Sequence, residues 1–107
     1  MDTVNSHSSS TLTAAFSDEN GNPVTPTSAR YRIDDDASGF QIKGWTNITA
    51  LAESVGIEIS RTENDVHDTN AAEEVRVVTV DFSYGSGKGG DVEYRYSLKN
   101  VKGMLKT

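Results

Sequence analysis

Apolar residues recur at every second position through most of the chain, which is the period of a strand that buries one of its two faces. Turn-forming clusters of Gly, Asn, Asp and Pro separate these stretches, and helical spacing is nearly absent. Residues 47–54 leave room only for one short helical turn or a bent connection. A short final strand around Met104 and Leu105 would bring the count to seven. Six segments carry the alternation: residues 12–16, 29–33, 40–48, 55–59, 75–84 and 92–98. This pattern predicts an all-β sandwich.

The longest alternating segment changes phase in its middle. Val75 and Val77 follow one phase, whereas Val78, Val80 and Phe82 follow the other. Since successive side chains point to opposite faces, the adjacent Val77 and Val78 predict a β-bulge. The alternative is a central strand buried on both faces, which would imply that another subunit covers the outer face.

The polar stretches set the expected domain boundaries. Residues 1–10 are mostly polar and include four serines, so we expect a flexible N-terminal arm. Residues 11–107 then form a single sandwich domain. Residues 61–74 are the longest irregular segment, with only Val66 to bury, and such a loop is either mobile or ordered by a partner.

Composition narrows the class of protein. The chain has 107 residues, no cysteine and a formal net charge of −6, which excludes a disulfide framework and argues against non-specific binding to nucleic acid. No apolar run is long enough for a membrane-spanning helix, and the first residues lack the pattern of a secretory signal. Residues 1–90 hold 14 acidic and 6 basic side chains, whereas residues 91–107 hold 2 acidic and 4 basic ones. Copies could therefore associate head to tail, although a solvated strand end is the favoured explanation of the asymmetry.

Candidate chemical motifs do not meet the requirements of known sites. Lys88 lies in a glycine-rich stretch, but Gly89 follows it where a P-loop needs Ser or Thr. The acidic turns at residues 18–23 and 34–39 space oxygens like the start of a calcium loop, yet Trp45 stands at the twelfth position of the second. Each is expected to be a plain turn, with a weak surface cation as the alternative. His67 with Asp65 and Asp68 could bind a metal only loosely. We therefore expect no catalytic, cofactor-binding or metal-binding residues and no enzymatic activity.

Aromatic side chains have two interpretations. Trp45 and the tyrosines on alternating strand positions are expected to fill the core. The alternative is an aromatic platform for a sugar, which would make the protein a carbohydrate-binding or adhesion module. The tyrosines concerned are Tyr31, Tyr94 and Tyr96.

The glycosylation sequon at Asn47-Ile48-Thr49 has no expected use without a secretion signal.

The C-terminal part of the chain resembles immunoglobulin-like domains. Residues Tyr94-Arg95-Tyr96-Ser97-Leu98-Lys99-Asn100-Val101-Lys102-Gly103 look like the penultimate strand of fibronectin type III and related domains. Trp45 would correspond to the core tryptophan of such sandwiches. The chain departs from the pattern in its short final strand, which another subunit would then complete.

A second resemblance concerns function. The series Ala15-Phe16-Ser17-Asp18, Pro26 to Asp35, Trp45-Thr46 and Glu74 to Val80 is similar to small virion proteins of tailed bacteriophages. This resemblance implies a non-enzymatic structural protein of the head, neck or tail, or a decoration protein. The protein would be made in the bacterial host cytoplasm and located in the virion. Its implied partners are other virion proteins and copies of itself, as a homo-oligomer, with no nucleic acid and no membrane.

Overall fold

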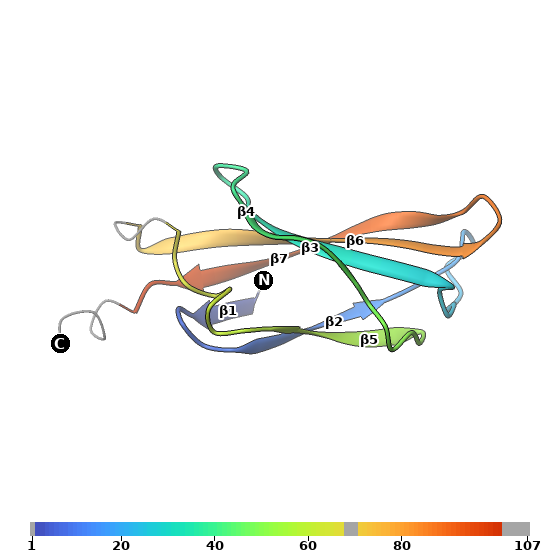
Figure 1. Ribbon diagram of the computed structural model, residues 1–107, viewed down its shortest axis with the longest axis horizontal. Helices are drawn as coiled ribbons and strands as arrows, with labels where there is room; N and C mark the ends of the chain where they lie inside the picture. The colour runs from blue at the N-terminus through green and yellow to red at the C-terminus, as the bar shows by residue number, and fades with distance from the viewer. Residues whose placement is uncertain (1, 68–70, 102–107) are drawn as a thin grey trace.

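The protein is an all-β domain built from two layers. A computed structural model describes residues 2–67 and 71–101 (Figure 1). Its seven strands are β1 (Asp2–Asn5), β2 (Ser10–Ala15), β3 (Ser28–Asp35), β4 (Gln41–Asn47), β5 (Ser54–Ile59), β6 (Glu73–Gly85) and β7 (Lys88–Lys99). The described residues contain no helix, and residues 48–53 form a bent connection. All six strands with strong alternation are confirmed, whereas the weak strand around Met104 and Leu105 falls outside the described residues.

The larger layer is a five-stranded sheet in the order β1-β7-β6-β3-β4, and the smaller layer is the antiparallel pair β2-β5. All pairings are antiparallel except β1 with β7, which run parallel. Figure 1 shows the pair β2-β5 lying along one side of the long β6-β7 hairpin. The molecule is elongated, with extents of 53 × 23 × 21 Å.

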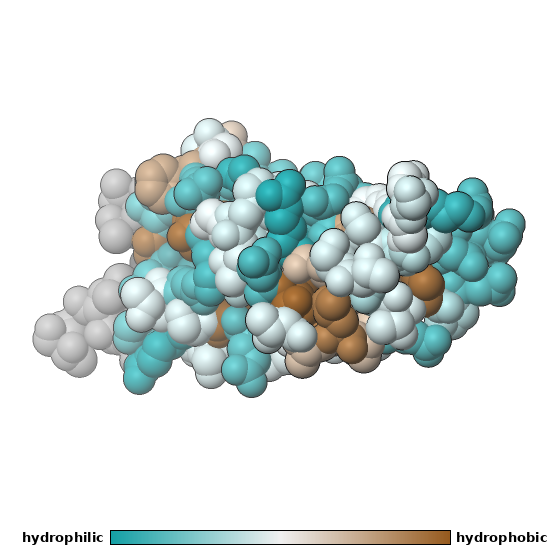
Figure 2. All heavy atoms as spheres, turned by 45° about the vertical axis from the view of Figure 1, so that its right-hand side comes forward, coloured by the Kyte–Doolittle hydropathy of each residue, from teal (hydrophilic) through white to brown (hydrophobic). Residues whose placement is uncertain are grey.

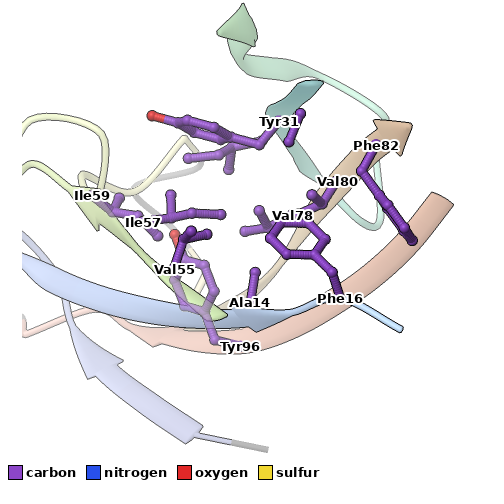
Figure 3. Packing of buried hydrophobic residues seen from close by; sticks show 12 residues of the cluster. Ala14, Phe16, Tyr31, Val55, Ile57, Ile59, Val78, Val80, Phe82 and Tyr96 are labelled. Carbon is purple, nitrogen blue, oxygen red and sulfur yellow. The ribbon is translucent and has the colours of Figure 1, made fainter. Parts of the chain in front are cut away.

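The core lies between the two layers, where inward side chains from both sheets point toward one another (Figure 3). The strand β5 illustrates the cause, because its residues alternate regularly between exposed and buried positions. Phe16 from the small layer packs against Phe82 from the large one, with ring centroids 5.0 Å apart. The fully or nearly fully buried aliphatic members of the cluster are Ala14, Ala29, Ile33, Val55, Ile57, Ile59, Val78 and Val80.

The predicted bulge in β6 is wrong. Its register with β3 and β7 runs without a shift through Val77 and Val78, and both side chains are buried on opposite faces. The alternative, a strand buried on both faces, is therefore the observed one. This burial occurs within a single chain, without the second subunit that the alternative implied. Val77 pairs with Asp34 and Arg95, and both neighbours form ion pairs on that face. Long charged side chains cover apolar surface with their stems, so no second subunit is needed to bury this valine.

The prediction of a flexible N-terminal arm also needs correction. Strand β1 pairs with β7 over four residues, and Ser6 N–H continues the ladder by donating to the Lys99 carbonyl at 2.7 Å. Backbone hydrogen bonds to a sheet edge need no apolar side chains, which is why a polar composition concealed this strand. Beyond β1, the chain crosses at residues 6–9 to the small layer.

The β6-β7 hairpin explains the glycine-rich stretch. The strands extend to Gly85 and from Lys88, so only Ser86 and Gly87 form the turn, with Gly87 at a φ of 68°. Gly89 lies inside β7, where a Cβ atom would stand 2.2 Å from the Phe82 carbonyl oxygen. Close approach of two backbones therefore requires glycine at this position.

Candidate functional site

The motifs weighed in the sequence form ordinary structural elements. Lys88 opens β7 and pairs with exposed Glu19 at 3.0 Å, so the glycine-rich stretch is a hairpin with no helix after it. In the acidic turn after β3, buried Asp35 accepts hydrogen bonds from the backbone N–H and the hydroxyl of Ser38. The Asp34 carboxylate is paired with Arg32, whose guanidinium donates to both carboxylate oxygens. Across the described residues, no three His, Asp or Glu side chains gather closely enough to hold a metal ion.

The two histidines lie apart and make different contacts. His7 Nδ1 lies 2.6 Å from the Asp65 carboxylate. The His67 ring stacks on exposed Phe40, with centroids 4.1 Å apart. The third residue of the loose metal site weighed in the sequence, Asp68, lies outside the described residues.

Trp45 is not a core residue. It is 41% exposed on the outer face of β4, and the Arg30 guanidinium lies 4.2 Å from its ring centroid. The tyrosines follow the expected pattern better, since Tyr31 and Tyr96 are buried and Tyr94 packs partly against the core. The tryptophan and these tyrosines therefore share no surface.

Residues 63–65, between β5 and β6, contact a buried polar cluster that the sequence analysis missed. Arg76 is 0% exposed and donates to the backbone carbonyls of Glu63 and Asp65 at 2.8 and 2.6 Å. Asn64, also 0% exposed, accepts a hydrogen bond from the Tyr96 hydroxyl at 2.7 Å. A signal was present, because Arg76 shares the inward phase of Val78 and Val80. Residues 63–65 are thus held by contacts within the same chain.

An unpaired sheet edge is the clearest functional feature of the described structure. In β5, the N–H and C=O groups of every second residue bond to β2, as Phe16 N–H does with the Glu53 carbonyl just before the strand. Antiparallel alternation then directs the backbone groups of Ser54, Gly56 and Glu58 away from β2. Within the described part of the chain, no hydrogen-bond partner is found for these outward groups.

Beside this edge lies a groove between the two layers. A space of about 470 Å³ has a lining of mixed polarity. Its apolar members are Tyr31, Ile48, Ala50, Val55 and Ile57, and its polar members are Asn47, Thr49, Ser54 and Glu58. Figure 2 shows one apolar patch in the lower half of the molecule, at the height of the β2-β5 layer, and further apolar atoms at the left-hand end. An extended segment placed along β5 would meet backbone groups on one side and this groove on the other.

A second hollow continues along β5 toward its C-terminal end, with a volume of about 540 Å³. Its polar wall is the ion pair of Lys43 with Glu63, whose charged atoms are 2.8 Å apart. The hydrogen bond with Glu63 raises the pKa of Lys43. Burial favours a higher pKa for Glu63, but hydrogen bonds from Lys43 and Ser60 outweigh it and lower that pKa. Both groups are therefore charged at neutral pH, and Glu58 lines both hollows.

The other three edge strands are protected. Strand β1 has only four residues. Strand β4 pairs with β3 through two register shifts, which twist an edge away from a regular ladder. The outer edge of β2 is partly closed by the Tyr94 hydroxyl, which accepts from Ala15 N–H at 3.2 Å. Strand β5 has six residues, no proline and an unbroken register with β2. The sequence indicated strand edges in general, but only the topology selects β5.

Two further findings concern membrane-spanning helices and the similarity to known proteins. No helix within the described residues is long and apolar enough to cross a membrane. In comparisons with known proteins, no family model, no curated protein and no solved structure matches this chain.

Proposed function

We propose that the protein is an immunoglobulin-like sandwich that serves as a non-enzymatic structural component of a tailed-phage particle. The sheet orders support the finer fold. Immunoglobulin-type domains place the third, sixth and seventh strands together in one sheet, extend it by an added strand after the third, and pack the second and fifth strands opposite. Strands β3, β6, β7 and β4 form such a sheet here, with β2-β5 opposite.

The observation that carries the assembly function is the unpaired edge of β5 beside a groove of mixed polar and apolar lining. A partner strand added to this edge would gain main-chain hydrogen bonds from Gly56 and Glu58, and its alternate side chains would enter the groove next to Ile57. The partner would be another virion protein or a copy of this chain, within a homo-oligomeric assembly. This mode of binding needs no catalytic group, cofactor or metal.

Proline substitution provides a direct test. Glu58→Pro removes an outward N–H and places a ring at the β5 edge, where proline is tolerated in a folded edge strand. Thr13→Pro is the matched control, because Thr13 pairs with Gly56 and its N–H points out from the other edge of the same sheet. We expect Glu58→Pro to abolish incorporation into purified particles and self-association in light scattering. Thr13→Pro retains both.

The outcome that overturns the proposal is equally concrete. A wild-type chain that stays monomeric at all concentrations and is absent from purified particles by mass spectrometry contradicts the structural role. If the two proline variants are folded by circular dichroism and are incorporated equally, the result contradicts assembly through the β5 edge but leaves the structural role in place.

One observation favours a second candidate, a carbohydrate-binding or adhesion module. Trp45 presents an exposed ring on the outer face of β4, as a sugar platform requires. Arg30 already lies over this ring, and no tyrosine named above joins it on that surface. A glycan array compares wild type with Trp45→Ala. Binding that the substitution removes would support this function, and absence of binding by the wild type rejects it.

A further inference from the structure

The short linker between β1 and β2 has a strained backbone. His7, in the middle of residues 6–9, has a φ of 61°, and it is the one residue other than glycine with positive φ in the described chain. Most side chains disfavour this left-handed region, although His occupies it more often than most residues. The linker must turn here because β1 lies in the large layer and β2 in the small one.

The contacts of β1 are of a kind that any copy of the chain can supply. It pairs with β7 in register from Asp2 with Tyr96 to Asn5 with Lys99, and only Val4 packs partly against the core. Most of its binding therefore comes from the backbone ladder. An identical strand from a second copy would form the same ladder on the same β7 edge.

Polar contacts from several residues hold the linker closed. Asn64 accepts a hydrogen bond from His7 N–H through its backbone carbonyl and donates through its side chain to the Ser8 carbonyl, both at 2.8 Å. The Asp65 carboxylate binds the His7 ring. Arg61 Nε donates to the His7 carbonyl at 3.3 Å, and Val101 N–H donates to the Ser6 hydroxyl at 3.0 Å. These polar contacts oppose release of the arm, whereas the backbone strain at His7 favours it.

We propose that β1 is an exchangeable arm, which can leave its own β7 and pair with the β7 of a second copy to form a reciprocal dimer. Short hinge loops under strain invite such exchange, because the exchanged strand keeps its contacts while the hinge relaxes. An extended linker of four residues spans at most about 14 Å, so the two β7 edges must lie close together. This surface is separate from the β5 edge, so the proposal does not depend on the proposed function.

Cysteine cross-linking tests the exchange, because the natural chain contains no cysteine. Asn5 and Lys99 are exposed register partners on β1 and β7, and adjacent strands place Cα atoms within disulfide range. Asn5→Cys and Lys99→Cys are made in separate chains, mixed, incubated and oxidised. Exchange predicts a disulfide-linked heterodimer at least about tenfold above a control mixture of Thr13→Cys with Lys99→Cys. Heterodimer at the control level after prolonged incubation at high concentration overturns the proposal.

Hinge variants supply an independent measurement. Proline cannot adopt the φ of His7 and lacks the N–H bonded to Asn64, so His7→Pro should favour the exchanged dimer. Glycine adopts this φ without strain, so His7→Gly should favour the closed monomer. With one strained hinge per copy, we expect the dimer dissociation constants of the two variants to differ by roughly 5- to 30-fold or more. Equal constants for two folded variants would contradict a hinge role. Cross-linking that persists in Glu58→Pro separates arm exchange from β5 assembly.

Discussion

Replacement of Tyr96 by phenylalanine should destabilise the protein at neutral pH but not at alkaline pH. The Tyr96 hydroxyl is 2.7 Å from Asn64 Oδ1, and Asn64 is fully buried. Tyr96→Phe leaves this acceptor without its donor, which costs about 1–3 kcal/mol of unfolding free energy. Burial raises the pKa of Tyr96 to about 12, with the nearby Arg76 acting in the opposite direction.

The pH dependence follows from this shift. The unfolded state releases the phenolic proton near pH 10, whereas the folded state retains it to about pH 12. The stability contributed by Tyr96 is therefore complete below pH 10 and is lost as the pH rises, by up to about 3 kcal/mol for a shift of two pKa units. Phenylalanine has no such loss, so the advantage of the wild type shrinks or reverses above pH 11.

Urea unfolding followed by circular dichroism at pH 8, 10 and 11.5 measures the difference between wild type and variant. The other tyrosines are present in both proteins, so their contributions cancel in the difference of unfolding free energy. Tyr84→Phe is the control, because half-buried Tyr84 stacks on Phe82 and its hydroxyl has no hydrogen bond among the described residues. A difference in unfolding free energy between wild type and Tyr96→Phe that stays constant across this pH range would falsify the claim that the protonated, buried Tyr96 hydroxyl stabilises the fold.

Three further substitutions test other parts of the structure in the same unfolding assay. Gly89→Ala should cost about 1–3 kcal/mol through its contact with the Phe82 carbonyl, whereas Gly85→Ala, with its nearest neighbour 3.9 Å away, should cost little. Arg76→Leu should cost about 3–5 kcal/mol, because it leaves two backbone carbonyls buried without their donor and removes the cation that faces the buried Glu74 carboxylate. Trp45→Ala should cost less than about 1 kcal/mol, since the ring is exposed, and a loss of 3–5 kcal/mol would instead indicate a core tryptophan.

The strands were predictable because their information is local. An alternation such as Val55, Ile57 and Ile59 is read directly from neighbouring residues, and the structure buries these three side chains. The placement of Trp45 was not predictable, because period 2 reports which residues share a face but not which face meets the core. Arg30 and Arg32 on the neighbouring strand made the outer face acceptable for an indole.

The errors in β1 and β6 have a different origin. A bulge and a doubly buried strand produce the same adjacent valines, and only the charged side chains from β3 and β7 decide between them. Likewise, no residue in positions 2–5 signals a strand by itself, since β1 depends on an edge of β7 formed some 90 residues later in the chain. Contacts between distant segments are absent from any local pattern.

The same reasoning explains why topology selects the β5 edge as the candidate assembly surface. Each edge of a sheet offers unpaired backbone groups, and folded proteins protect such edges against unwanted pairing. Here β1 is short, β4 is irregular and β2 is partly closed by Tyr94. Since the other three edges are protected, the regular, proline-free β5 edge is an exception. We attribute this exception to the proposed binding of a partner strand. Glu58 on that edge adds negative charge, which discourages pairing between acidic copies unless the approaching strand brings a compensating basic or neutral face.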